Sequence, residues 1–101
     1  MHRRKLNNPR KRSRQRETLF SRTVLCTLGG ITEHDLRLWE HEEFIAPADL
    51  IEASNGAEPV YDQLALRRIR TIRTLADELG VNLPGIGVIL HLLDQFPPSE
   101  R

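Results

Sequence analysis

Two adjacent glycines, Gly29 and Gly30, separate two short segments of helical periodicity, and this break restricts the fold more than any other feature of the sequence. Glycine readily adopts the positive φ angles that end a helix. Thr32 follows the break at the position of an N-cap, before a second run of apolar residues at helical spacing. The sequence therefore predicts helices over about 18–28 and 33–42, joined by a tight corner that is typical of a helix-turn-helix.

The segment 44–61 has the composition of a wing. It carries two prolines and an Asn55-Gly56 turn, between the apolar pairs Phe44-Ile45 and Val60-Tyr61. Such pairs on either side of a turn predict two short strand-like arms around a loop. We expect a small wing here, either a loop or a hairpin.

Two further helices are expected after the wing. Asp62 is a plausible N-cap for a long amphipathic helix over 63–79, and Asn82 for a helix that runs to about Gln95, with Pro84 near its first position. Together these elements predict an all-α fold, a winged helix-turn-helix of four helices. Its core is expected to comprise Leu25, Leu28, Leu36, Trp39, Phe44, Ile45, Val60, Ile69, Ile72, Leu79, Ile86 and Leu90.

The basic residues are concentrated at one end of the chain. Residues 1–16 hold eight of the fifteen lysines and arginines and no acid, whereas residues 17–101 hold seven basic and fourteen acidic residues. A like-charged block with Asn, Ser and Pro between the charges cannot bury apolar area, so we expect a disordered tail over 1–17, a folded domain over 18–96 and a disordered end over 97–101. The tail is a candidate contact for nucleic acid or an acidic surface. A tail that only aids solubility, or a stretch upstream of the true start, remains an alternative.

The sequence gives no support to several classes of protein. No run of 18 apolar residues or secretion signal is present, so neither a membrane nor export is expected. The lone Cys26 excludes an internal disulfide and suits a reducing cytoplasm. His34 and His41 lie two helical turns apart, about 10 Å, too far to share a metal. No phosphate loop or catalytic constellation is evident, so we expect no cofactor, no metal and no enzymatic activity.

Several motifs resemble a known family. The segment Ile31–Glu40 is similar to the second helix of MerR-type winged helix-turn-helix proteins, with Leu38 in place of an aromatic residue. The segments Leu25–Thr32, Val60–Asp62 and 82–94 look more specifically like the chaperone-modulator CbpM branch. This resemblance implies a small cytoplasmic bacterial protein that binds the J-domain of a DnaJ-type co-chaperone, CbpA. It would inhibit by occlusion, blocking the co-chaperone's stimulation of DnaK and its association with DNA.

A MerR-type DNA-binding transcriptional regulator is the alternative, and charge bears on the choice. DNA affinity comes largely from cations that contact phosphates. Residues 44–61 contain no Lys or Arg, and residues 33–43 contain five acids against Arg37. An acidic helix-turn-helix suits a basic J-domain better than DNA. The basic tail and Arg37 keep the DNA alternative open.

The partner is expected to contact the outer face of the second helix. This stripe comprises Glu33, His34, Arg37, Leu38 and His41, with Leu38 as an exposed apolar anchor. A merely solvated stripe is the alternative. The last helix carries more apolar residues than one core contact requires, which makes it a second candidate interface and leaves a homodimer open. Its candidate residues are Val88, Leu92 and Phe96.

Overall fold

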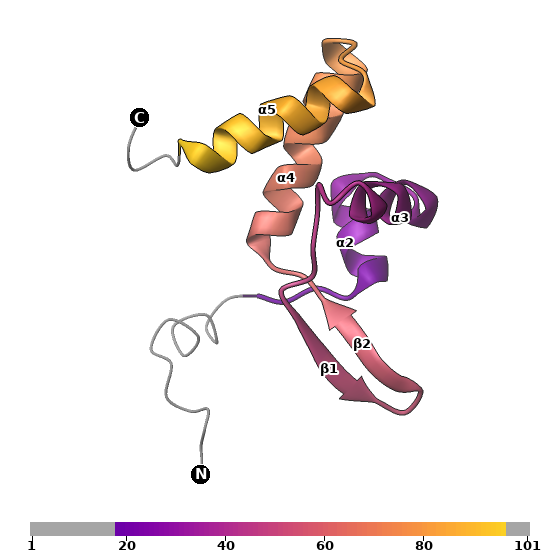
Figure 1. The fold of residues 1–101 in the computed structure, drawn as a ribbon. Helices are drawn as coiled ribbons and strands as arrows, with labels where there is room; N and C mark the ends of the chain where they lie inside the picture. The colour runs from indigo at the N-terminus through magenta and orange to yellow at the C-terminus, as the bar shows by residue number, and fades with distance from the viewer. Residues whose placement is uncertain (1–17, 97–101) are drawn as a thin grey trace.

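The computed structural model describes residues 18–96, so the expected tail 1–17 and the end 97–101 lie outside the described residues. In Figure 1, α2 and α3 pack beside α4, α5 crosses the far end of α4, and the hairpin projects away from the helices. The elements are α2 (Arg22–Gly29), α3 (Glu33–His41), β1 (Asp49–Ala53), β2 (Gly56–Val60), α4 (Gln63–Arg73), a π-helical segment η1 (Thr74–Glu78) and α5 (Leu83–Gln95).

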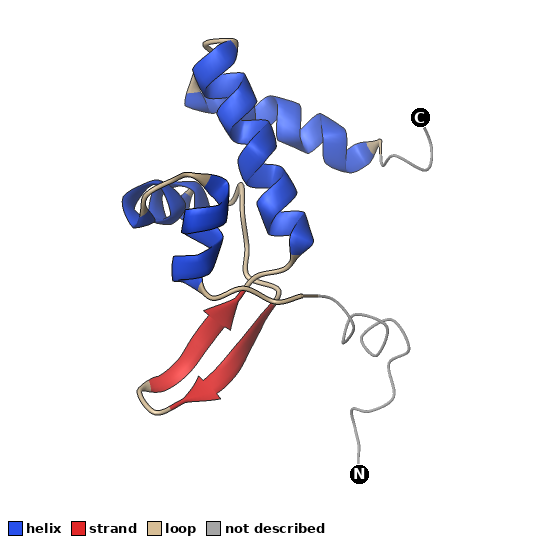
Figure 2. Ribbon diagram, turned by 180° about the vertical axis from the view of Figure 1, so that it is seen from behind, coloured by secondary structure: helices blue, strands red, loops and turns tan. Residues whose placement is uncertain are grey.

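The expected all-α class is wrong, because the wing is a two-stranded antiparallel sheet (Figure 2). Asp49 pairs with Val60 at one end of the hairpin and Ala53 with Gly56 at the other. The strands also lie elsewhere than expected, since Phe44 and Ile45 are buried in the core and form no strand. The strand sequences show no clean alternation of apolar and polar residues, so periodicity could not reveal them.

Side-chain caps define where the helices begin. The side chains of Thr32, Asp62 and Asn82 each accept a hydrogen bond from a backbone N–H in the first turn, as expected. Ser21, which was not foreseen, caps α2, and this helix therefore starts at Arg22 instead of near residue 18. Gly30 ends α2 at φ 71°, which confirms the left-handed corner between the two helices.

The helix after the wing changes its geometry near its end. Its last segment, η1, contains the wider i to i−5 hydrogen bond from Leu79 N–H to the Thr74 carbonyl. This bond spans one residue more than the bond of an α-helix, so the side chains that follow point in a different direction from those of a continued α-helix. Leu79 is consequently 67% exposed, and its expected place in the core is wrong.

The core surrounds α4. Ile69 and Ile72 lie at its centre with no exposed area, and Trp39 packs in it at 8% exposure, as predicted. Gly29 brings α2 close to α4, since a Cβ atom there would lie 2.8 Å from Ile69 Cγ2. Leu28 was expected in the core but is 50% exposed, because α2 buries the neighbouring stripe of Leu25, Cys26 and Gly29. Five core residues lie outside the expected list: Phe20, Cys26, Tyr61, Ala65 and Leu66.

Candidate partner-binding surface

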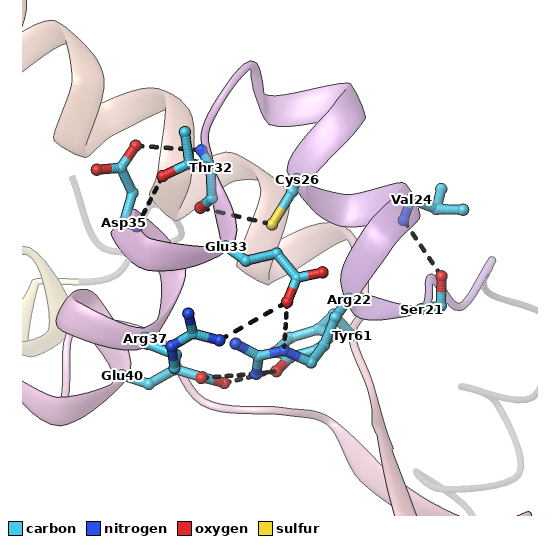
Figure 3. Close-up of polar contacts among 10 residues, drawn as sticks. All are labelled: Ser21, Arg22, Val24, Cys26, Thr32, Glu33, Asp35, Arg37, Glu40 and Tyr61. Atoms are coloured by element: carbon cyan, nitrogen blue, oxygen red, sulfur yellow. Dashed lines mark hydrogen bonds and ion pairs between the residues drawn. The ribbon is translucent and has the colours of Figure 1, made fainter.

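The helix-turn-helix corner fixes the direction in which α3 presents its outer face. The N–H of Ile31 donates to the carbonyl of Cys26 at 3.0 Å, which ties the corner to α2. At the start of α3, Thr32 and Asp35 form a reciprocal capping box with bonds of 3.0 and 3.1 Å. The first turn of α3 is therefore held at both the corner and the cap, and Figure 3 shows the two bonds of the capping box.

The expected stripe on α3 is brought together only in part. His34, Arg37 and His41 are exposed, and Glu33 lies beside them with a carboxylate oxygen 3.9 Å from Arg37 Nη1. Leu38 differs from the expectation, because it is partly buried and packs against the core. The outer face of α3 thus offers polar groups to a partner, and its expected apolar anchor belongs in part to the fold.

A partly buried polar cluster on α2, α3 and the residue after β2 was not predicted from the sequence. Arg22 Nη1 donates to Glu40 Oε1 and to the Tyr61 hydroxyl, both at 2.8 Å, and that hydroxyl donates to Glu40 Oε2 at 2.5 Å (Figure 3). The cluster joins α2, α3 and the end of the hairpin. It also neutralises Glu40 and Arg22 internally, so neither contributes a free charge to the surface.

Burial disfavours the ionised forms of Tyr61 and Cys26. Burial raises the pKa of Tyr61, and its hydrogen bond to Glu40 raises that pKa further. Burial also raises the pKa of the Cys26 thiol, with a smaller contribution from the negative charge of Glu33. Cys26 is therefore a core residue with a weak hydrogen bond to the Thr32 carbonyl, and not an activated nucleophile.

The surface formed by α3, the following loop and the hairpin is acidic. Arg37 is the exposed cation among residues 33–61, which also hold eight acids; Glu40 is paired with Arg22, and seven others remain. Only two of these acids, Glu33 and Asp35, are engaged within the described residues by an arginine or a helix cap. We call this region the acidic surface; its members are Glu33, Asp35, Glu42, Glu43, Asp49, Glu52 and Glu58.

The arginines of α4 are not all solvated. Arg68 donates to the Phe44 carbonyl at 2.6 Å and to Asp94 at 2.8 Å, so it ties α4 to the loop and to α5. Arg73 donates to the Gly29 carbonyl and pairs with Asp77, one helical turn further on, at 3.3 Å. Arg67 and Arg70 remain exposed.

The second candidate interface on α5 is accessible. Val88, Leu92 and Phe96 are all exposed, while Ile86 and Leu90 on the opposite face are buried. Among residues 18–96 no group of three or more metal-ligating side chains is assembled. No helix in this range is both long and apolar enough to cross a bilayer.

The two short helices around a tight corner, followed by a projecting hairpin and a long helix, define a winged helix-turn-helix protein. A family described as "MerR HTH family regulatory protein" matches residues 20–98. The chain belongs to this MerR helix-turn-helix family. A search of curated proteins finds no match. The MerR-type part of the sequence resemblance is therefore confirmed, and the family is one of regulatory proteins.

Proposed function

We propose that the domain 18–96 binds a basic protein surface through α3 and the hairpin, and that its partner is the J-domain of a DnaJ-type co-chaperone. The observation that carries this proposal is the acidic surface, where seven acids stand against the single exposed Arg37. Complementary charge speeds encounter and excludes like-charged partners. The resemblance to the CbpM branch supplies the identity of the partner, and the charge pattern supports it.

The proposed mechanism is occlusion. A partner that docks across α3 would contact His34, Arg37 and His41 and approach the acids of the hairpin. The inward side of α3 is fixed by the cluster of Arg22, Glu40 and Tyr61, so the surface is presented without rearrangement. Covering the J-domain in this way would block its action on DnaK and its association with DNA. This role places the protein in the cytoplasm.

The test is calorimetric titration of the full chain against the cognate J-domain, with paired charge reversals. The double variant Glu52→Lys with Glu58→Lys changes both faces of the hairpin. The two residues belong to neighbouring cross-strand pairs, and neighbouring pairs point to opposite faces of the sheet. Asp77→Lys with Glu78→Lys makes the same change in charge on η1, at the opposite end of the molecule (Figure 1). We expect the hairpin variant to bind about tenfold more weakly, a loss of about 1.4 kcal/mol, and the η1 variant to bind normally. Equal weakening in both variants, or no binding by the wild type, would remove the proposal.

The two candidate interfaces can be separated in the same assay. Because Leu38 packs against the core, its substitution would disturb the fold as well as the surface. We therefore compare His34→Ala with His41→Ala on α3 against Leu92→Asp on α5, all at exposed positions. Loss of binding in the α3 variant alone supports the outer face of α3. Loss in the Leu92→Asp variant alone moves the interface to α5.

DNA binding is the second candidate function, and membership of the MerR family favours it directly. The residues that could contact phosphates are Arg37, on the exposed face of α3, and the eight basic residues of 1–16. Selection of binding sites from random duplexes at 0.15 M salt tests this function. A regulator should select duplexes of one defined sequence. Arg37→Ala should then lower the affinity for that sequence and reduce by about one the slope of log affinity against log salt concentration. DNA binding that requires only residues 1–16 and is the same for every duplex sequence would indicate non-specific electrostatic attraction.

A further inference from the structure

A groove of about 490 Å³ lies where the loop after α3, the start of α4 and the end of α5 meet. Three acids, Glu43, Asp62 and Asp94, line it together with one cation, Arg68. Arg68 is already balanced within the fold by Asp94 at 2.8 Å and by the Phe44 carbonyl at 2.6 Å. Asp62 caps α4, so it is Glu43 that gives the groove its excess of negative charge.

The helix ends around the groove add to this negative potential. Glu43 directly follows the C-cap of α3, and Asp94 lies in the last turn of α5. The C-terminal end of a helix carries partial negative charge and favours cations. The N-terminal end of α4 has the opposite sign, but Asp62 caps it. Taken together, these groups favour a positively charged occupant.

The uncharged residues that line the groove indicate which kind of cation it suits. Ala46, Pro47 and Ala48 line one side of the groove, and the exposed Leu64 and the buried Ala65 line it from α4. Lysine and arginine side chains place their methylene stems along such apolar surface and their charged ends beside carboxylates. The groove thus suits a basic peptide segment better than a small inorganic cation.

The chain itself leads such a segment toward the groove. Phe20 and Tyr61 form an antiparallel bridge, with N–H to carbonyl distances of 2.7 and 2.8 Å in the two directions. In an antiparallel pair, the residues before Phe20 run alongside those after Tyr61, which means toward Asp62 and the start of α4. Residues 1–16, with eight basic residues and no acid, precede this bridge and are separated from Phe20 by residues 17–19.

We propose that the basic segment 1–16 binds in this groove of its own chain. Sixteen residues can reach about 50 Å when extended, which exceeds what the adjacent groove requires. The covalent connection gives the segment an effective concentration on the order of millimolar, so weak individual ion pairs suffice. The segment then covers the groove and is withheld from nucleic acid. This proposal does not depend on the J-domain and stands whether or not that partner binds.

Paramagnetic broadening in the full chain tests the proposal. The Ser13→Cys variant takes a nitroxide label in the basic segment, while Cys26 is buried in the core and is checked by the label-to-protein ratio. We expect the label to broaden the amide signals of Ala46, Ala48 and Leu64 at low salt. Broadening should disappear in 1 M salt, where the screening length falls to about 3 Å.

A matched pair of variants separates the groove from general attraction to an acidic domain. The double variant Glu43→Lys with Leu64→Lys reverses the charge of the groove. Glu52→Lys with Leu50→Lys makes the same chemical change on one face of the hairpin. All four side chains are exposed, so both variants should fold. The groove variant should lose the broadening and the hairpin variant should keep it. Broadening that is absent from the wild type, centred on the hairpin, or retained in the groove variant overturns the proposal. Broadening of an unlabelled copy mixed with a labelled one assigns the contact to a second chain and also overturns it.

Discussion

The helical body and the hairpin are built on different principles. The body buries large apolar side chains around α4, whereas the hairpin leaves both Leu50 and Ile51 exposed. The strands pair with each other, and the hairpin joins the body through its root, where Val60 and Tyr61 are buried. Folding stability therefore comes from the body, since burial of apolar area is the dominant favourable contribution.

This difference frees the hairpin sequence from the requirements of folding. Residues that contribute little to the core can be varied for contact with a partner at small cost to stability. The hairpin nevertheless holds a fixed orientation, because its root passes directly into the cluster of Arg22, Glu40 and Tyr61. A binding element attached rigidly to a stable body suits a regulatory protein that covers its partner.

The largest effect is expected from Ile69→Ala in the centre of the body. Ile69 has no exposed area and packs against Gly29 of α2, so truncation leaves a cavity between α2 and α4. Such a substitution costs about 3 to 4 kcal/mol in the free energy of unfolding. Urea titration followed by Trp39 fluorescence and circular dichroism measures the loss. A cost below about 1 kcal/mol would contradict the placement of Ile69 at the centre of the core.

Tyr61→Phe should have an intermediate effect at the junction of body and hairpin. The substitution keeps the ring buried but removes the hydroxyl that bonds both Arg22 and Glu40, at a cost of about 1.5 kcal/mol. Glu40→Gln serves as a control, because it changes the charge of the cluster and retains the ring and hydroxyl. An unchanged midpoint in urea for Tyr61→Phe would show that these hydrogen bonds add nothing to stability.

Tyr61→Phe also tests how the stability of the fold depends on pH. Because the pKa of Tyr61 is raised in the folded state, its hydroxyl ionises more readily in the unfolded chain. The wild type should therefore lose stability as the pH rises above the ordinary tyrosine value of about 10, and Tyr61→Phe should lose less. Cys26 also has a raised pKa and contributes a similar loss at somewhat lower pH in both proteins. Parallel stability curves for the two proteins above pH 10 would contradict the shift at Tyr61.

Signals that act over three or four residues predicted most of the helices. Thr32, Asp62 and Asn82 marked the helix starts and Gly30 the corner, because caps and left-handed turns depend on neighbouring residues alone. These local rules also gave the inward face of α3, including Trp39. The MerR-type architecture could thus be predicted, although its class was wrongly given as all-α.

Contacts between distant residues could not be predicted in this way. Arg22 meets Glu40 and Tyr61 across 18 and 39 residues, and no spacing rule connects such positions. Strand pairing in the hairpin depends on register between two segments that lack alternation. The partial burial of Leu38 follows from how α3 packs against the body and not from its position on the helix. The sequence therefore predicted the exposed side of α3, whereas the partial burial of Leu38 depends on tertiary structure; that this face binds a partner stays a prediction.

Thr32→Ala should have a smaller effect, confined to the start of α3. It removes the hydroxyl that accepts the Asp35 N–H and leaves the Asp35 carboxylate as the remaining half of the capping box. Loss of an N-cap costs about 1 kcal/mol. Thr32→Ser keeps the hydroxyl and should retain most of the stability. Equal destabilisation by both substitutions would assign the effect to the lost methyl group and not to the cap.

The smallest effect is expected from Ile51→Ala, the same truncation that is so costly at Ile69. Ile51 is 46% exposed on the hairpin and lies opposite Glu58, so truncation uncovers no core and opens no cavity. The free energy of unfolding should change by about 0.5 kcal/mol or less. If the hairpin serves a partner and not the fold, binding should respond to Ile51→Ala more strongly than stability does. A destabilisation comparable to that of Ile69→Ala would show that the hairpin is part of the folding core, and the division between body and hairpin would no longer hold.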